Sequence, residues 1–597
     1  MARPIRIANA SGFYGDRFSA MREQVIGGDI DVVTGDYLAE LTMFILWKTA
    51  KRGSTPGYAI SFLRQMEQVL GECVERGIKI VTNAGGLDPA SLAIDLRVLA
   101  DELKIDVSVA HIEGDDLVPR LGELVESGHR MTNVDTGTDL SDLDRDPITA
   151  NVYLGGWGIT EALTYGADVV ICPRVTDASL VVGPAAWHHG WQRDDWDRLA
   201  GAVVAGHVLE CGAQATGGNF AFFKEIEDLT HPGFPIAEVA VDGSSVITKH
   251  DGTGGAVTVD TVTAQILYEI DEPAYRNPDV VAHFDTISLD QVGDDRVRIT
   301  GVRGSHAPHE LKVALNYVGG YRNSVTLGLV GLDVEEKAKL VEDGLMARLK
   351  EERRPQVIEC RLAAGGAPDA DTNEGAASML TITAMDDDPI KVGRRFANAI
   401  IELALASYPG FFATTPPSKE SAFGVYWPAM IARRAVTQEV VLADGRRIVV
   451  PDPPTGETPS VLAPRDAVPA TKTGPTISVP LGTLVGARSG DKGGNANIGV
   501  WARNDDVYRW LSENLTVDTL GELLPEVADL DVERYELPNV RGLNFTIHGL
   551  LGKGVASSTR FDPQAKSLGE WLRSRHMDIP ESLLLDRSVL PEGGTPE

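Results

Sequence analysis

The chain has few cysteines, no long apolar run and no motif of a secreted protein. Its 597 residues include four cysteines, none in a CxxC pair or with the spacing of zinc ligands. Disulfides and zinc motifs are therefore not expected. No apolar run approaches the roughly 18 residues that span a bilayer, and the N-terminus lacks the apolar core of a signal peptide. We expect a cytoplasmic protein that does not bind or span a membrane.

Positive charge is also scarce. There are 55 basic and 86 acidic residues, and the formal net charge is −31. This balance argues against nucleic acid as a partner, because such proteins need a basic surface. A small anionic ligand stays compatible with it, since a few local Arg, Lys and N–H groups decide that binding. The remaining composition is that of a soluble globular protein, and the length predicts two or three domains.

The motifs of nucleotide cofactors are missing as well. Residues 487–499 (ARSGDKGGNANIG) lack the GxxxxGK[ST] spacing of a phosphate-binding loop. Gly156-Trp157-Gly158 begins a dinucleotide pattern, but Glu161 stands where the third glycine belongs. A nicotinamide or flavin cofactor is therefore disfavoured, and we expect none.

A repeated pattern runs through the first third of the chain: a short apolar run, a glycine turn and a helix start. Residues 78–82 are the best example, because they lead into Gly85-Gly86 and then into Asp88-Pro89, a typical first turn of a helix. Repetition of this kind predicts right-handed β-α-β units. We expect an α/β fold with a mostly parallel sheet flanked by helices.

Four regions are predicted along the chain. Residues 1–235 form the α/β domain with glycine loops at the strand ends. Residues 236–450 change to short alternating strands and predict a β-rich α+β region packed on the first domain. Residues 451–475 are rich in proline and are interpreted as a linker. Residues 476–597 predict a small α+β domain of ferredoxin-like type.

Acidic residues follow the predicted strand at 30–34. Asp36 and Glu40 are four apart, so on a helix that opens at Gly35 both carboxylates point the same way. They are either a capping acid and a solvated acid, or an acid/base pair at the end of a strand. Asn83, which ends the strand at 78–82, is expected beside them, because parallel strands end at one edge of the sheet.

The segment Arg174-Val175-Thr176-Asp177-Ala178-Ser179 follows another predicted strand. Arg174 suits a clamp for a carboxylate or phosphate, with Thr176 beside it. Asp177 acts either as a base or as the cap of the next helix. The N–H groups of Gly85 and Gly86 suit an oxyanion.

Two further groups of residues are candidates. His207 lies one turn from Glu210 and Cys211 on a predicted helix and would serve as a base, with Cys211 either a thiolate or a packed core residue. His207, His250 and a carboxylate would bind a metal only if they met in space. The second group lies in residues 487–499 and either binds an anion or forms a tight structural turn. Its members are Arg488, Ser489, Lys492 and Asn495.

Several long motifs resemble the acyclic terpene utilisation protein A (AtuA-like) family. They are TGDYLAELTM at 34–43, NAGGLDP at 83–89, RVTDASL at 174–180, HVLECGAQATGGNF at 207–220 and ARSGDKGGNANIGV at 487–500. The resemblance covers essentially the whole chain. It implies a large N-terminal α/β domain, a small C-terminal ferredoxin-fold domain and a role in bacterial breakdown of acyclic terpenes such as citronellol and geraniol. It carries over no catalytic residues.

Three functions fit this reading. The first is a hydratase or lyase that acts on an acyl-CoA or related carboxylate, with Asp36, Glu40, Asp177 or His207 moving the proton and Asn83 helping to hold the oxyanion. The second is a non-catalytic partner that binds an acyl-CoA or an acyl-CoA carboxylase. The third is a metal-dependent hydrolase. We expect a homo-oligomer in each case.

Overall fold

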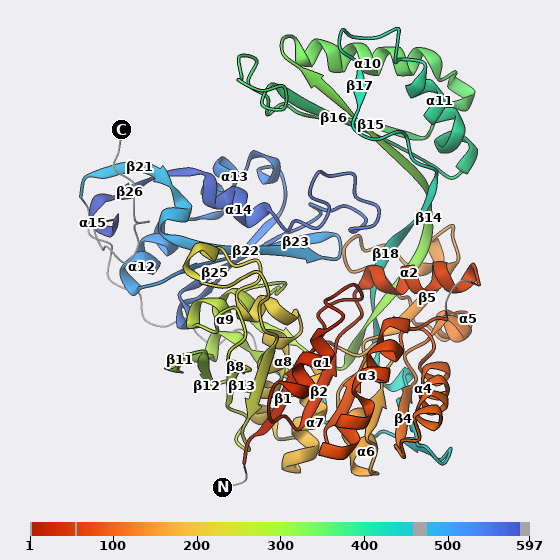
Figure 1. The fold of residues 1–597 in the computed structure, drawn as a ribbon, viewed down its shortest axis with the longest axis vertical. Coiled ribbons are helices and arrows are strands. Elements are labelled where there is room, and N and C mark those ends of the chain that lie inside the picture. The colour runs from red at the N-terminus through yellow and green to blue at the C-terminus, as the bar shows by residue number, and fades with distance from the viewer. Residues whose placement is uncertain (1–2, 54–55, 458–473, 585–597) are drawn as a thin grey trace. The chain divides into compact units, whose positions relative to one another are not determined.

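The computed structural model describes residues 3–53, 56–457 and 474–584. The chain divides into two units. The first holds Met1–Asn316, Tyr426–Val555 and Asp562–Glu597, and the second holds Tyr317–Val425 and Ala556–Phe561. The long strands β14 (Glu310–Val330) and β18 (Ser421–Ala432) each carry residues of both units (Figure 1).

The first unit is built on an eleven-stranded sheet with the order β11-β12-β8-β7-β1-β2-β3-β6-β4-β19-β20. Its five central strands are mutually parallel: β1 (Ile5–Asn9), β2 (Val32–Gly35), β3 (Lys79–Thr82), β6 (Val169–Ile171) and β4 (Val109–Glu113). These strands are short, apolar and almost fully buried, as expected for strands covered on both faces. The predicted α/β core is present.

The outer strands correct the prediction of a mostly parallel sheet, because all of them pair antiparallel. They are β7 (Pro235–Val239), β8 (Ser245–Lys249), β12 (Arg296–Thr300) and β11 (Ser288–Gly293) on one side, and β19 (Glu439–Val441) and β20 (Arg447–Val449) on the other. Several of the alternating strands expected in a separate region from residue 236 onward thus extend the first sheet, whereas β9 (Ala274–Arg276), β10 (Val281–His283) and β13 (Arg303–Ser305) form a sheet of their own. Antiparallel hairpins pair locally and need no crossover helix. The change in the sequence pattern at residue 236 therefore indicated a change in strand direction.

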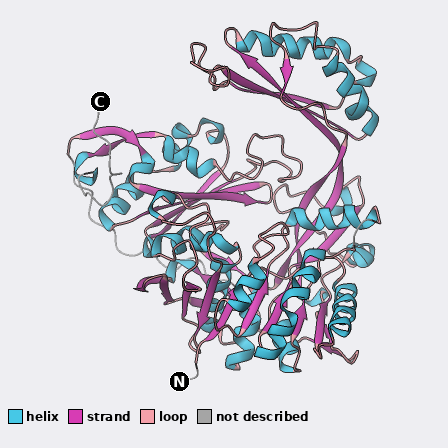
Figure 2. Ribbon diagram, in the orientation of Figure 1, coloured by secondary structure: helices cyan, strands magenta, loops and turns pink. Residues whose placement is uncertain are grey.

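Helices cover both faces of the parallel strands (Figure 2). The helices α1 (Ala20–Ile26), α3 (Ile60–Arg76) and α4 (Pro89–Leu103) share one apolar core with these strands. The helices α6 (Trp157–Thr164) and α7 (Ser179–His189) contact the parallel strands and each other, and α8 (Trp196–Leu209) packs on α7 and on outer strands of the sheet. Asp88 caps α4 by accepting from Ser91 N–H, as predicted.

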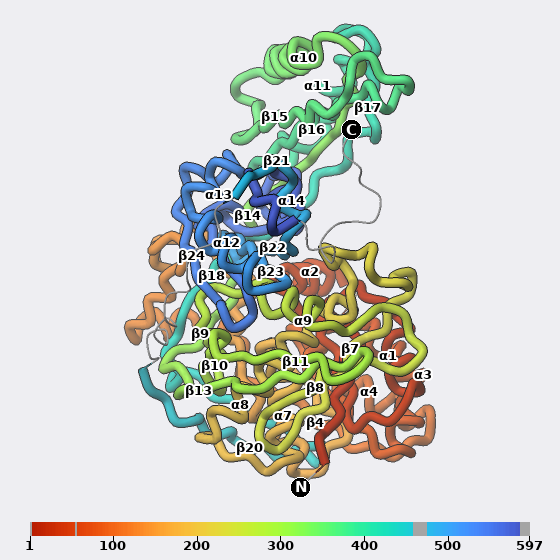
Figure 3. The backbone as a smooth tube through the Cα atoms, turned by 90° about the vertical axis from the view of Figure 1, so that its left-hand side faces the viewer, coloured from red at the N-terminus to blue at the C-terminus, as the bar shows by residue number. Residues whose placement is uncertain are grey.

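The C-terminal part of the first unit has a four-stranded antiparallel sheet of its own, in the order β22-β23-β25-β24. The strands are β22 (Val485–Lys492), β23 (Asn495–Ala502), β25 (Gly542–Ile547) and β24 (Val532–Leu537), with helices α12 (Asp505–Asn514), α13 (Val517–Leu523) and α14 (Leu568–Ser574). An apolar core around Leu511, Phe545 and Leu572 holds them together. Strands β22 and β23 contact α9 (Val259–Ile266) of the preceding region (Figure 3).

The second unit is smaller. Part of β14 pairs with β16 (Ala377–Asp386) and β17 (Phe412–Ala413), and β15 (Val357–Ala363) completes the order β15-β16-β14-β17. Helices α10 (Val334–Arg348) and α11 (Phe396–Ile401) pack on it through a core that includes Val325, Leu345 and Phe396. The predicted linker falls largely on residues 458–473, outside the described residues.

Candidate functional site

Arg174 lies just beyond the end of β6 and is 2% exposed. Its Nη1 donates to the carbonyl oxygen of Leu38 at 2.7 Å, and its Nη2 lies 3.2 Å from Asp177 Oδ1. The guanidinium also stacks on the ring of Tyr153 at 4.3 Å. Several charged groups share its surroundings, and together with Arg174 we call them the Arg174 cluster: Asp36, Glu40, Tyr153, Asp177, Glu210 and Lys312.

Asp36 is held in this cluster by Asn83. Asn83 Nδ2 donates to Asp36 Oδ1 at 2.6 Å, while its own Oδ1 accepts from Tyr37 N–H at 2.7 Å. Both side chains are buried. The helix expected to open at Gly35 begins later, because α2 spans Glu40–Lys51 and Asp36 precedes it. Asp36 and Glu40 therefore do not share a helix face, and each reaches the cluster from a different local structure.

The environments of Asp36 and Glu40 drive their pKa values apart. Burial raises the pKa of Asp36 to about 7, although Arg174 and Asn83 oppose it. Burial also acts to raise the pKa of Glu40, but Lys312 and Arg174 outweigh it and lower the value to about 2. Glu40 Oε1 accepts from the Tyr153 hydroxyl at 2.9 Å. One carboxyl group thus titrates near neutrality while its neighbour stays ionised, a pattern typical of acid–base sites.

Asp177 does not cap α7, which has Ala178 at its N-cap and no side-chain cap. Its side chain is 31% exposed and pairs with Arg174. Burial, together with the nearby carboxylates, raises its pKa against the effect of Arg174. Thr176 is bound within its own loop, since its Oγ1 lies 2.6 Å from Ser179 Oγ. The prediction that Asp177 caps α7 is therefore wrong, and its role as a base stays a prediction.

The glycine turn after β3 does not present free N–H groups. Gly85 N–H donates to the carbonyl oxygen of Cys172 at 3.2 Å, and Gly86 N–H donates to that of Asn83 at 3.2 Å. Gly86 has a φ of +52°, which favours glycine. The predicted oxyanion role of Gly85 and Gly86 is therefore corrected: these donors already have acceptors, and the turn serves the packing of the loop.

His207 is buried at the end of α8, with Nδ1 3.1 Å from Glu210 Oε1. Its ring packs against Tyr275 and Phe284, each with a ring centroid 5.3 Å away. Glu210 acts on the titration of both Asp36 and Asp177, so it connects His207 to the cluster. Burial raises the pKa of Cys211 well above its usual range, which disfavours the thiolate reading.

Sequence reasoning missed Lys312, Tyr153 and Tyr426. Lys312 Nζ lies 3.7 Å from Glu40 Oε1 and over the rings of Tyr153 and Tyr426, at 5.1 and 5.8 Å. Lys312 and Tyr426 come from β14 and β18, far along the chain from Glu40. Lys312 and Tyr426 each lie in a strand with alternating side chains, as many other residues do, so no local pattern distinguished these two.

Arg488 and Ser489 lie on β22, where the anion site of residues 487–499 was expected. Arg488 Nη1 donates to the carbonyl oxygen of Asn219 at 2.8 Å, and Nη2 donates to Gln214 Oε1. Ser489 Oγ accepts from Gly569 N–H at 2.8 Å. These polar groups are used within the chain: Arg488 connects β22 to the loop after α8, and Ser489 connects β22 to α14.

Lys492 and Asn495 lie at the tip of the β22–β23 hairpin. Lys492 Nζ donates to the carbonyl oxygen of Glu269 at 2.6 Å and lies 5.6 Å from the ring centroid of Tyr275. Asn495 Nδ2 donates to Asp135 Oδ1 at 3.1 Å. Through Tyr275, which also contacts His207, the hairpin reaches the edge of the Arg174 cluster.

Comparison with protein families shows which family the chain belongs to. The profile of the acyclic terpene utilisation family protein AtuA matches residues 5–442, and that of the AtuA ferredoxin-like domain matches residues 479–578. The chain belongs to the AtuA family. Membership supports a role in acyclic terpene utilisation and confirms both the predicted resemblance and the C-terminal ferredoxin-like domain. No curated protein matches the chain.

Two buried asparagines of the AtuA ferredoxin-like domain bind the main chain of residues 267–271. Asn497 donates to the carbonyl oxygen of Leu267 at 2.9 Å and accepts from Glu269 N–H at 2.8 Å. Asn544 donates to the carbonyl oxygen of Asp271 at 2.6 Å. Asn497 also donates to Asn544 Oδ1 at 2.7 Å. We call this pair the asparagine clamp. It sets the position of the segment that leads to Tyr275.

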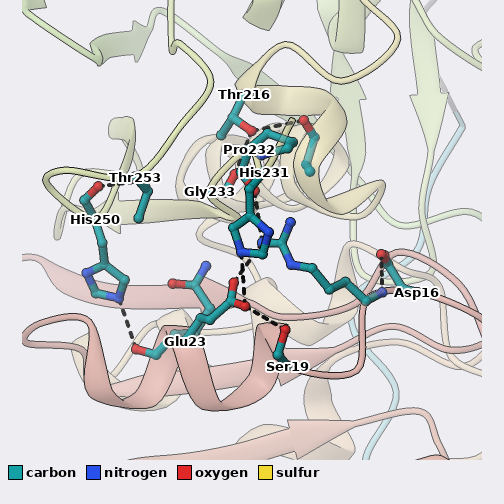
Figure 4. A network of polar contacts seen from close by, with 12 residues as sticks. Asp16, Ser19, Glu23, Thr216, His231, Pro232, Gly233, His250 and Thr253 are labelled. Atoms are coloured by element: carbon teal, nitrogen blue, oxygen red, sulfur yellow. Dashed lines mark hydrogen bonds and ion pairs between the residues drawn. The ribbon is translucent and has the colours of Figure 1, made fainter. Parts of the chain in front are cut away.

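The metal-site hypothesis requires His207 and His250 to lie close together. Figure 4 shows His250 directed at the main chain of α1, where its Nε2 lies 2.9 Å from the carbonyl oxygen of Gln24. His231 in the same view pairs with Glu23. Across the described residues, no group of three or more His, Cys, Asp and Glu side chains is arranged to hold a metal ion. Nor does that part of the chain contain a helix with the length and apolarity to cross a membrane.

Proposed function

We propose that this AtuA-family protein is an enzyme that adds or eliminates water on a branched acyl compound, a CoA thioester or the related carboxylate, during the breakdown of acyclic terpenes. The observation that carries the proposal is the pair Asp36 and Glu40 beside Arg174. A carboxyl group with a pKa of about 7 can both give and take a proton at neutral pH.

The residues then have distinct roles. Asp36 exchanges the proton with the substrate, and Asn83 fixes the orientation of its carboxyl group. Glu40 stays ionised, so it is a weak base, and it orients the Tyr153 hydroxyl. Arg174 holds the surrounding carboxylates together and limits the rise of the pKa of Asp36.

The reaction needs no redox step. When a β-hydroxyacyl compound loses water, the Cα–H and Cβ–O bonds break and a carbon–carbon double bond forms. A base takes the Cα proton, and the departing hydroxyl takes a proton from an acid, so charge balances. Asp36 is assigned one of these transfers, and the other is assigned to Asp177, which pairs with Arg174, or to His207, which pairs with Glu210.

A panel of branched enoyl and β-hydroxyacyl CoA thioesters and free acids tests the proposal. Incubation in deuterium oxide followed by mass spectrometry detects exchange at Cα or gain of water. We expect turnover of at least one compound, and a loss in kcat of about 10² to 10⁴ in Asp36→Asn, the range for a missing proton-transfer group.

Glu23→Gln is the matched control, because it removes a carboxylate that pairs with Arg17, Ser19 and His231 away from the cluster (Figure 4). It should leave turnover unchanged. Binding of the thioesters without any exchange or turnover would instead support the non-catalytic alternative, and binding of none of them would overturn the substrate class.

A further inference from the structure

We propose that Lys312 is the residue that holds the acyl carbonyl oxygen of the substrate while negative charge develops on it. This inference rests on the proposed function and extends it, because it assigns the electrophilic group and therefore the orientation of the substrate. It is carried by the position of Lys312, by its unused hydrogen-bond donors and by its exposure.

The position places a second cation in the Arg174 cluster, beside Glu40 and Tyr153. Lys312 extends from β14 between the rings of Tyr153 and Tyr426, at 5.1 and 5.8 Å. Tyr153 in turn donates to Glu40 and stacks on Arg174. An oxygen bound at the ammonium would therefore lie next to Glu40 and Tyr153, which share the surroundings of Arg174 with Asp36.

The donors of Lys312 are not consumed by the protein. Its nearest carboxylate oxygen, Glu40 Oε1, is 3.7 Å away, beyond hydrogen-bond distance, and it already accepts from Tyr153. Within residues 3–53, 56–457 and 474–584, Lys312 Nζ has no hydrogen-bond acceptor, and its side chain is 36% exposed. A lysine that served only to balance Glu40 would be expected to bond it directly.

The charge of Lys312 is permanent at physiological pH. Burial acts to lower its pKa, but Tyr153, Glu40 and Asp271 outweigh that effect and raise it to about 12. Such an ammonium is unsuited to attack a carbonyl carbon as a free amine. It is suited to donate charge-assisted hydrogen bonds to an enolate oxygen, and interactions of this kind strengthen as the negative charge develops.

In the proposed step, a base removes the Cα proton. The electron pair of the Cα–H bond moves into the bond between Cα and the carbonyl carbon, and the π electrons of the carbonyl group move onto its oxygen. Lys312 stabilises that oxygen. The electrons return when the Cβ–O bond breaks and hydroxide leaves with a proton from the acid. No oxidant or reductant is consumed.

The test compares ligands that differ in charge on oxygen. Calorimetric titration measures the binding of 3-methylbut-2-enoate and of its neutral amide to the wild-type protein, to Lys312→Gln and to Lys312→Arg. We expect the wild type to prefer the carboxylate by about 10- to 100-fold, the range for a charge-assisted hydrogen bond. Lys312→Gln should abolish the preference, and Lys312→Arg should restore part of it.

Lys79→Gln is the control, since Lys79 pairs with Asp168 at 2.8 Å on the sheet, outside the cluster. It should keep the full preference. The role of Lys312 would be overturned if Lys312→Gln lost affinity for both ligands equally, or if its preference for the carboxylate were unchanged. If Lys312→Gln does not fold, wild-type protein that binds carboxylate and amide equally overturns it. Failure of the wild type to bind either ligand would count against the proposed substrate class instead.

Discussion

From the sequence, the same role of anion binding is predicted for Arg174 in the α/β region and for Arg488 in the AtuA ferredoxin-like domain. In the structure, the surroundings of these two arginines differ. Arg174 pairs with Asp177 and shares its surroundings with Asp36 and Glu40, all of them ionisable. Arg488 donates to a main-chain oxygen and to the side chain of Gln214. Neutral acceptors fix the position of an element, whereas ionisable neighbours also shift one another's protonation. The comparison supports the proposed chemical role of the first arginine and a docking role for the second.

The largest expected effect comes from removing the first arginine. Arg174→Met leaves the carboxyl groups around it without their cation, so we expect a loss of about 3 to 5 kcal/mol in the free energy of unfolding. Denaturant titration measures this loss. Arg130→Met, at an exposed pair with Asp139, should change little. A loss in Arg174→Met no greater than in Arg130→Met would contradict the cluster as described.

A smaller loss is expected in the docking region. Asn497→Ala leaves the main-chain groups of Leu267 and Glu269 without partners, so stability should fall by about 3 kcal/mol, from about 1 to 3 kcal/mol for each group. Asn504→Ala, which removes only the cap of α12 in the same domain, should cost about 1 kcal/mol. Equal losses in the two variants would show that the asparagine clamp is not what fixes the segment.

The last effect is a pH dependence, which is the smallest of the three when counted per pH unit. Because burial raises the pKa of Asp36 to about 7, the folded state binds a proton that the unfolded state releases near pH 4. Stability from this group is full below about pH 4 and falls as the pH rises toward 7, with a slope of up to about 1.4 kcal/mol per pH unit. Other buried acids titrate in the same range, so the measurement is the difference between wild type and Asp36→Asn.

Denaturant titrations from pH 4 to pH 8 give that difference. The variant should lose less stability than the wild type as the pH rises. Parallel pH profiles for the two proteins would contradict the raised pKa of Asp36. The same variant in the turnover assay should also lose a transition near pH 7 in kcat/KM.

The sequence predicted what depends on local patterns. The parallel strands, the start of α4 and the gathering of Asp36, Asn83 and Arg174 at strand ends follow from periodicity and from the geometry of parallel sheets. Lys312 and Tyr426 could not be found this way, because they arrive on strands that are remote in sequence. Gly85 and Gly86 show the other limit, since a glycine turn does not reveal whether its N–H groups already have acceptors.

The asparagine clamp has a consequence for variation within this protein. Its amides bind carbonyl oxygens and an N–H group, which every residue other than proline supplies, so substitutions of the less buried side chains Glu269 and Asp271 leave these bonds intact. Changes at Glu269 or Asp271 can therefore alter the charge at the edge of the site while the backbone path is kept. The clamp makes the segment a place where the charge beside the proposed site can change without rebuilding the fold.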